Sequence, residues 1–345
     1  MIGIDLFAGA GGMSTGAQWA GVDVRYCIEC DKNSAETYRL NHKNTEVIEA
    51  SIESIECFSR LRNGKDIVLF GGPPCQGFST SNQRTRSATN SKNWLFLEFL
   101  RAVHQLQPKL VVFENVKGLT ETSGAFFLKE LLNGFDKLGY KAKYSVLNSV
   151  DFGVPQKRAR LFILASKYGN TPDFPKFGNR EKTTVRDAIM DLPNLVNGST
   201  DRILQYKSEP STEYAYRMRG GATECIGHDV TRNAPHVLKR YAHIPQGGNW
   251  ENIPKSLMKN YSNRNRCHSG VYRRLSWDEP SAVIGNYRKN MLIHPSQDRG
   301  LSVREAARLQ SFPDNYVFSG SIGFKQQQVG NAVPPMLAEA IFSNI

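Results

Sequence analysis

The sequence predicts an α/β fold built on a mostly parallel sheet, and three observations lead to that prediction. Short apolar runs alternate with segments of helical periodicity through the first half of the chain, as in strands joined by crossover helices. The apolar runs are continuous, which is typical of strands that are buried on both faces. The chain has 345 residues, 40% of them hydrophobic, which is enough for about two globular units.

Each element is predicted by its own pattern. Strands are expected at 2–8, 24–28, 67–70, 110–113 and 161–165. Helical periodicity covers 10–20, 33–41, 94–107, 125–138, 185–192, 302–312 and 335 to the end. The helix 94–107 has the clearest pattern, because Phe96, Phe99 and Leu106 fall on one apolar stripe that stops before Pro108.

A change of texture after about residue 170 indicates a second domain. Residues 214–274 hold eleven Lys or Arg against three acidic residues, and so supply +8 of the net charge of +12. This excess favours a polyanionic partner, nucleic acid before an anionic membrane. We therefore expect a catalytic domain over 1–174, a basic insertion over 175–275, and a return over 276–345 that completes the first domain.

Several classes of protein are disfavoured. No apolar run approaches the ~20 residues of a membrane span, and we expect no secretion signal. Six cysteines are too sparse for a disulfide scaffold in a chain of this length, which favours a reducing cytoplasm. We expect no metal, because His228, His236 and His243 do not have zinc-ligand spacing and no CxxC pair accompanies them.

The segment 5–12 reads DLFAGAGG and lies where a strand is expected to turn into a helix. Glycines let a ligand approach the backbone there, and the helix N-terminus offers free amide donors. The alternative is a structural turn, and a nicotinamide-binding fingerprint would have glycine where Ser14 stands. Glu29 ends the next strand, either as a ligand for a ribose diol or as a solvated turn acid.

The segment 71–79 reads GGPPCQGFS and directly follows a buried strand. Its two prolines and three glycines fix the backbone around Cys75 at the edge where open α/β sheets bind ligands. A single cysteine is most often an inert buried residue, but a nucleophile requires this rigid positioning. Glu114 follows a second strand, so it is expected to meet Cys75 in one crevice and to serve as an acid.

The segment 156–160 reads QKRAR and leads into the strand 161–165. A period of two puts Gln156, Arg158 and Arg160 on one face, which suits a phosphate or the polar edge of a base. A solvated strand face is the alternative interpretation.

Taken in order, these segments resemble the cytosine-5 DNA methyltransferases, bacterial modification enzymes that use S-adenosylmethionine. The similarity covers DLFAGAGG at 5–12, PPCQ at 73–76, ENV at 114–116, QKRAR at 156–160, REAARLQSFP at 304–313 and GNAVPP at 330–335. The resemblance implies a Rossmann-like S-adenosylmethionine-dependent methyltransferase domain, plus a smaller irregular target-recognition domain in the basic insertion. It also implies double-stranded DNA as substrate, a monomer bound to the nucleoid, and a cognate restriction endonuclease as functional partner.

Carried over residue by residue, the resemblance implies catalytic roles for Cys75 as nucleophile, Glu114 as partner of the cytosine ring, and Arg158 and Arg160 as supports. It implies cofactor contacts for Phe7, Gly9, Gly11, Glu29, Pro74, Asn331 and Val333. DNA contacts are expected from Gln76, Ser79, Arg84, Arg86, Arg264 and Arg266. One departure is Ser51, which stands where many relatives place an acidic residue beside the adenine amino group.

Three other functions are alternative interpretations of the sequence. An RNA methyltransferase of the same fold shares the PPCQ centre, but the Cys-Phe-Thr tripeptide of that tRNA-modifying branch is absent from the sequence. A catalytically idle DNA-binding protein would need none of Cys75, Glu114 and Asn331. A nicotinamide oxidoreductase is disfavoured by Ser14.

Overall fold

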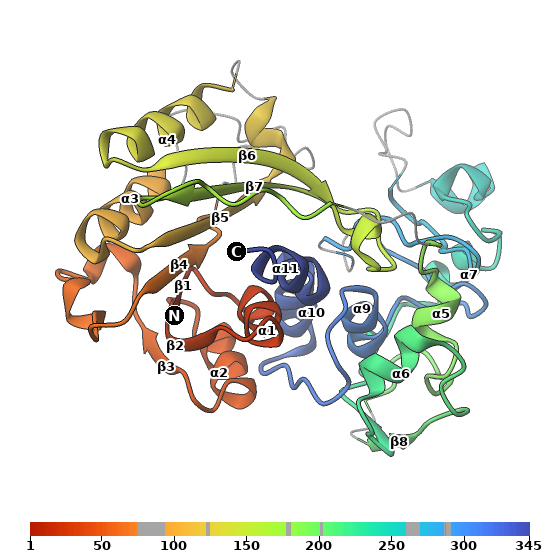
Figure 1. Ribbon diagram of the computed structural model, residues 1–345. Coiled ribbons are helices and arrows are strands. Elements are labelled where there is room, and N and C mark those ends of the chain that lie inside the picture. The colour runs from red at the N-terminus through yellow and green to blue at the C-terminus, as the bar shows by residue number, and fades with distance from the viewer. Residues whose placement is uncertain are drawn as a thin grey trace. The chain divides into compact units, whose positions relative to one another are not determined.

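The computed structural model describes residues 1–74, 94–121, 125–176, 181–200, 203–259, 270–285, 287 and 291–345. The chain forms two compact units (Figure 1). Unit 1 contains Met1–Phe152, Ala159–Gly178 and Pro335–Ile345, and unit 2 contains Gly153–Arg158 and Asn179–Pro334. Residues 276–334, which the sequence groups with the catalytic domain, therefore cluster with unit 2, while the function of each domain stays a prediction.

Unit 1 is built on a seven-stranded sheet with the order β3-β2-β1-β4-β5-β7-β6. Its strands are β1 (Ile2–Leu6), β2 (Asp23–Glu29), β3 (Glu46–Glu49), β4 (Ile67–Gly71), β5 (Leu110–Val116), β6 (Lys141–Asn148) and β7 (Ala159–Ser166). The first five pair in parallel, whereas β7 runs antiparallel to both β5 and β6. The predicted α/β fold with a mostly parallel sheet is confirmed.

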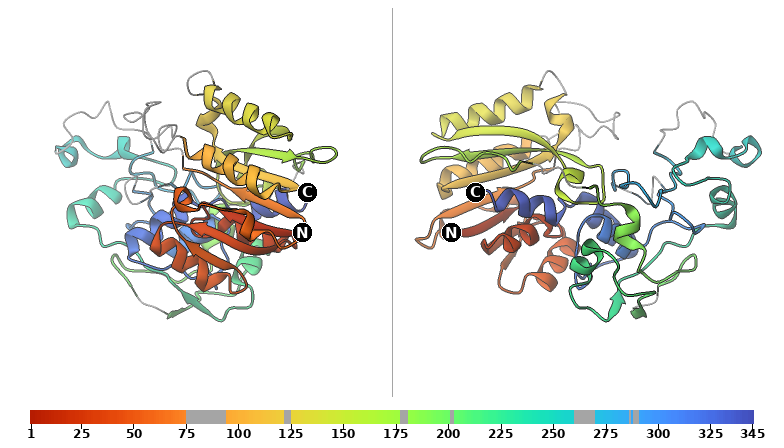
Figure 2. Two further views of the ribbon diagram at one scale, coloured as in Figure 1. Left: turned by 90° about the vertical axis from the view of Figure 1, so that its left-hand side faces the viewer. Right: turned by 45° about the vertical axis from the view of Figure 1, so that its right-hand side comes forward.

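Helices cover both faces of this sheet (Figure 1 and Figure 2). They are α1 (Gly12–Trp19), α2 (Lys32–Asn41) and α11 (Pro335–Phe342) on one face, and α3 (Leu95–Leu106) and α4 (Phe126–Lys137) on the other. Phe99 of α3 meets Phe113 of β5 edge to face, with centroids 5.2 Å apart. On the opposite face, Phe70 of β4 meets Phe342 of α11 at 4.9 Å. The apolar stripe predicted on α3 is buried as expected.

The two ends of unit 1 pack closely, α1 against α11. A Cβ on Gly16 would lie 2.3 Å from the carbonyl oxygen of Pro335 and 2.5 Å from Cβ of Ala338. No larger side chain fits at Gly16 unless the helices separate. This contact explains why the last eleven residues complete the unit that begins the chain.

Short 3-10 turns connect these elements. In unit 1 they are η1 (Ile52–Ser54), η2 (Ser59–Leu61), η5 (Lys117–Thr120) and η7 (Ser149–Phe152).

Unit 2 contains α5 (Val185–Ile189), β8 (Ile203–Gln205), α6 (Glu213–Arg219), β9 (Glu224–Ile226), α7 (Pro235–Tyr241), η8 (Trp250–Asn252), η9 (Lys255–Met258), α9 (Val303–Leu309) and α10 (Ile322–Asn331). Among the residues that the structure describes, no helix is long and apolar enough to cross a membrane.

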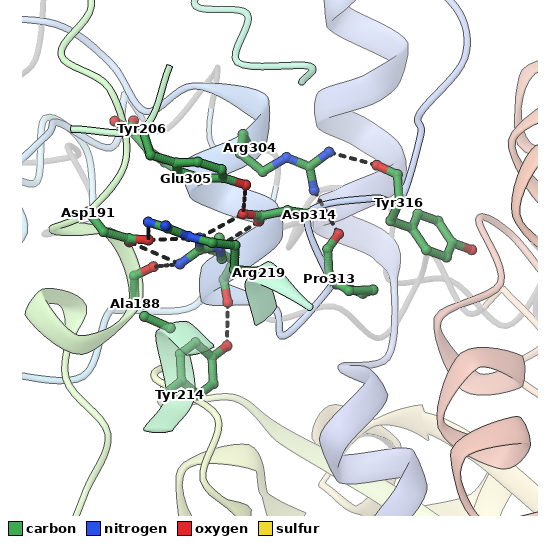
Figure 3. A network of polar contacts seen from close by, with 12 residues as sticks. Ala188, Asp191, Tyr206, Tyr214, Arg219, Arg304, Glu305, Pro313, Asp314 and Tyr316 are labelled. Carbon is green, nitrogen blue, oxygen red and sulfur yellow. Dashed lines mark hydrogen bonds and ion pairs between the residues drawn. The ribbon is translucent and has the colours of Figure 1, made fainter. Parts of the chain in front are cut away.

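Unit 2 is held together by buried arginines of α9 (Figure 3). Arg308 forms ion pairs with Asp314, at 2.6 Å from Nε to Oδ1, and with Asp191, at 3.1 Å from Nη1 to Oδ1. Arg219 of α6 reaches the same Asp191 at 2.8 Å. Arg304 donates instead to backbone carbonyls, including that of Pro313 at 2.9 Å. The segment 304–313 therefore has a structural role inside unit 2.

Candidate active site

The carboxyl end of β1 opens into a loop of unusual backbone geometry. Phe7, Gly9 and Gly11 have φ values of 58°, 55° and 82°, and Gly11 caps α1 without a side chain. A Cβ on Gly9 would meet no atom within 4 Å, so space lies open in front of the loop. The backbone is accessible to a ligand here, as the glycine pattern predicted.

Glu29 is fixed against this loop from the end of β2. Its Oε2 accepts a hydrogen bond from the Gly9 amide and its Oε1 accepts one from the Asp31 amide, each at 2.7 Å. An open backbone loop beside an oriented carboxylate is the arrangement that α/β proteins use for a nucleoside with a ribose diol. The residues present therefore fit an adenosine-containing cofactor.

A buried polar chain supports the loop from behind. Ser14 Oγ donates to Asp5 Oδ2, and Tyr38 OH donates to Ser14 Oγ, both at 2.6 Å. Burial raises the pKa of Asp5 to about 8, although the hydrogen bond from Ser14 opposes the shift and the nearby Glu29 adds to it. The residue patterns of the sequence do not predict these three hydrogen-bonded side chains. The signal for them was an acidic residue inside the apolar run 2–8.

The ends of β4 and β5 form a second part of the site. A Cβ on Gly72 would lie 2.5 Å from Glu114 Oε2, so any larger residue at this position would displace that carboxyl group. The side-chain amide of Asn115 donates to the carbonyl of Pro73 at 3.0 Å, which ties the two strand ends together. This segment runs directly into Cys75.

Glu114 is also paired with Arg160 of β7. Glu114 Oε1 lies 3.1 Å from Arg160 Nε, and the two side chains are only 13% and 15% exposed. Burial lowers the pKa of Arg160, and the Glu114 carboxylate opposes that shift. A carboxylate held in this way presents a fixed hydrogen-bonding group at the ligand edge of the sheet.

The described residues do not include all of the predicted site. Outside them lie Cys75, Gln76, Ser79, Arg84, Arg86, Arg264 and Arg266. Pro74 is the last described residue before this gap and is exposed. The proximity of Cys75 to Glu114 therefore stays a prediction.

The expected open face of Gln156, Arg158 and Arg160 needs correction. Arg158 is buried in unit 2 and donates to the carbonyls of Ile284, at 2.8 Å, and Gly330, at 2.9 Å. Gln156 is also buried and bonds to other residues of unit 2. The period of two does place polar residues together, but Gln156 and Arg158 form hydrogen bonds inside unit 2. Among the three, Arg160 alone joins the site of unit 1.

Two other expectations concern unit 2. Asn331 is exposed at the end of α10, and Val333 is buried. Their contact with a cofactor stays a prediction.

Within the basic insertion, Arg219, Arg240 and Arg274 are buried among protein partners, so these three cations do not contribute to a surface for phosphate. Within the described ranges, no group of three or more His, Cys, Asp or Glu is placed to hold a metal ion.

Comparison with known proteins identifies the family. The family model for C-5 cytosine-specific DNA methylases matches residues 1–345. The chain belongs to this family. It is 38% identical to the type II methyltransferase M1.HphI of Haemophilus parahaemolyticus, over 98% of this chain and 84% of that protein. It is 33% identical to the type II methyltransferase M.DdeI of Desulfomicrobium norvegicum, over 99% and 88% of the two chains.

Solved structures support the fold of this methylase. A DNA modification methyltransferase encoded within an E. coli prophage superposes with a TM-score of 0.81 at 24% identity, over 100% of this chain and 98% of that one. An Entamoeba histolytica methyltransferase, EhMeth, gives a TM-score of 0.62 at 14% identity. At these identities the likeness shows the shared Rossmann-like methyltransferase fold alone.

Proposed function

We propose that this methylase is the modification enzyme of a restriction–modification system. It transfers a methyl group from S-adenosylmethionine to carbon 5 of a cytosine in a specific sequence of double-stranded DNA. The observation that carries the proposal is the Glu114 carboxylate, which Arg160 holds against Gly72 at the ends of β4 and β5. The type II methyltransferases among its relatives support the link to a restriction system.

The chemistry explains why these residue types are needed. Carbon 5 of cytosine is a poor nucleophile, so the Cys75 thiolate first adds to carbon 6 and forms a C–S bond. Acting as an acid, Glu114 donates its proton in a hydrogen bond to ring nitrogen 3, which stabilises the negative charge that the addition places on the ring. S-adenosylmethionine supplies the electrophilic methyl group. Once carbon 5 has bonded to the methyl group, it carries both that group and its own proton. The proton passes to water, its bonding electrons restore the double bond between carbons 5 and 6, and the C–S bond breaks to release the Cys75 thiolate.

This reaction requires an extrahelical base. A cytosine stacked in the duplex exposes neither carbon 6 to a thiolate nor nitrogen 3 to a carboxyl group, so the base must be flipped out at a cost of a few kcal/mol.

A cysteine substitution tests the covalent step. Cys75→Ala is expected to abolish transfer of tritiated methyl groups while cofactor and DNA binding are retained. The matched control is Cys57→Ala, because Cys57 is an exposed free thiol of the same unit and lies outside the proposed site. Wild type and the control should also form a denaturant-stable adduct with duplex DNA containing 5-fluorocytosine, and Cys75→Ala should not. Substantial turnover by Cys75→Ala would refute the covalent mechanism.

The substrate is tested separately. Bisulfite sequencing of a plasmid from expressing cells should show methylated cytosines in one recurring sequence context. The proposal would be contradicted if tRNA became methylated while the plasmid DNA stayed unmodified.

A further inference from the structure

Arg101 connects helix α3 to the segment that follows β3. Its Nη1 donates to the carbonyl of Ile55 at 2.7 Å, and its Nη2 donates to the carbonyl of Ile52 at 3.0 Å. Its Nε donates to Glu98 Oε2 at 2.8 Å, and the guanidinium lies 4.7 Å from the centroid of the buried Phe58 ring. One planar side chain thus holds both carbonyls of a single turn in a fixed spacing.

The turn lies beside the nucleoside end of the candidate site. In the parallel pairing of β2 and β3, Glu29 is opposite Glu49, and the amide of Ala50 donates to the carbonyl of Glu29 at 3.1 Å. The sheet order is β3-β2-β1. A ligand whose ribose binds Glu29 and whose amino-acid end lies over the loop after β1 must extend its base toward the end of β3. This step rests on the proposed function.

The turn itself restrains one of these two carbonyls only weakly and the other not at all. In the 3-10 turn η1 the amide of Ser54 donates to the carbonyl of Ser51 at 3.0 Å, and the amide of Ile55 donates to that of Ile52 at 3.3 Å. The Ser54 hydroxyl also donates to the carbonyl of Ser51, and the side chains of Ile52 and Ile55 are buried in the core. Because 3-10 turns have weak hydrogen-bond geometry, the fork of Arg101 adds a direct restraint on the carbonyls of Ile52 and Ile55.

We propose that Arg101 is a positioning residue for the purine of the cofactor. Its fork fixes the turn 51–55, against which the base packs, and it does not touch the reacting atoms. Arg101 therefore governs affinity for the nucleoside, and it leaves the rate of methyl transfer at saturating cofactor unchanged.

The test measures binding directly. The variants are Arg101→Ala and Arg101→Lys, since lysine keeps the charge but cannot hold two carbonyls at once. Isothermal titration gives the Kd of S-adenosylhomocysteine and of adenosine, and thermal melting confirms that each variant is folded. In each variant, the Kd of S-adenosylhomocysteine and the Kd of adenosine should rise by the same factor. For Arg101→Ala that factor should be about tenfold or more. The KM for S-adenosylmethionine should rise in parallel, with kcat unchanged.

Two controls isolate the carbonyl contacts. Glu98→Gln removes the ion-pair partner of Arg101, 2.6 Å away, and leaves both carbonyl bonds, so the Kd should stay at the wild-type value. Lys109→Met removes an exposed ion pair with Asp66 at the opposite ends of the strands, and it should also leave the Kd unchanged.

The outcomes separate this inference from the proposed function. Wild-type protein that binds neither S-adenosylhomocysteine nor adenosine would overturn both. Wild-type binding with an unchanged Kd in folded Arg101→Lys and Arg101→Ala would overturn the inference alone. A lower melting temperature and a lower kcat without a change in Kd would give Arg101 a purely structural role and would also overturn it. If Arg101→Ala does not fold, Arg101→Lys decides.

Discussion

Glu114 and Arg160 form an ion pair across the antiparallel strands β5 and β7. In the register of these strands Arg160 is opposite Val116, so the two charged residues are diagonal neighbours on one face of the sheet. Arg160 Nε lies 3.1 Å from Glu114 Oε1, and Arg160 Nη1 donates to the carbonyl of its neighbour Ala159. We therefore expect the two residues to act as one unit.

A double-mutant cycle tests that coupling. Glu114→Gln should lower kcat by about 10²-fold or more, because the acid that donates a proton to ring nitrogen 3 is lost. Arg160→Met should also lower kcat, since Glu114 loses the group that orients it. The double variant should be little worse than Glu114→Gln alone, because residues in one network are not additive. The cycle is measured with tritiated cofactor at saturation, and fully additive losses would show that the residues act independently.

Binding provides the control for Glu114. The affinity of Glu114→Gln for DNA should change much less than its turnover. A loss of affinity as steep as the loss of turnover would make Glu114 a structural residue and would contradict its assignment to nitrogen 3.

The buried Asp5 should give the protein a measurable pH dependence. Its pKa is about 8 in the folded protein, against an ordinary value of 3.8. Between these two values the folded state binds a proton that the unfolded state has released, so stability falls as pH rises through this window. Asp5→Asn has no such proton, so its stability should fall less from pH 5 to pH 8. Urea unfolding at three pH values measures both slopes, and equal slopes would show that Asp5 does not titrate in this range.

The predicted strands were found where burial on both faces leaves a continuous apolar run. The two missed strands of the main sheet have other compositions. β6 is a mostly exposed edge strand that contains Lys141, Lys143 and Tyr144, and β3 is a four-residue strand with Glu at both ends. Neither has the apolar pattern on which the prediction depends. Helix α10 was missed for a related reason, because Gln326–Gln328 interrupt its apolar period.

The site shows a similar division. The placement of Glu29 and Glu114 at one edge of the sheet could be predicted because each lies at or near the carboxyl end of a strand, and these ends meet at one edge of a parallel sheet. The contact between Ser14 and Tyr38 joins residues 24 positions apart on two helices, and no local pattern reports it. Arg158 was misplaced because it precedes β7 and belongs to unit 2, and a local period of two does not show to which unit a residue belongs.

The basic insertion gives a prediction about salt. Arg219, Arg240 and Arg274 are buried within unit 2, so the share of counterion release that comes from residues 214–274 must arise from the other cations of that range. Neutralising Arg264 and Arg266 together should flatten the salt dependence of DNA affinity by about one to two units of slope if both contact phosphates. If either reads guanine, discrimination at one base pair should fall by ~1–3 kcal/mol instead.

Binding titrations at several salt concentrations, on target and scrambled duplexes, separate these two outcomes. Arg186→Ala is a suitable control, because Arg186 lies outside residues 214–274 and is already paired with Asp278 at 2.8 Å. An unchanged profile for the double variant would remove Arg264 and Arg266 from the DNA-binding surface.

Arg308 should dominate the stability of unit 2. Its guanidinium is fully buried between Asp314 and Asp191, and these carboxylates hold its pKa above the ordinary value even though burial acts in the opposite direction. Arg308→Ala leaves two buried acidic groups without their shared cation, which should cost about 3–5 kcal/mol. Arg186→Ala breaks an exposed pair and should cost about 1 kcal/mol or less. Urea unfolding followed by tryptophan fluorescence measures both, and equal losses would show that the buried network contributes no more than a surface pair.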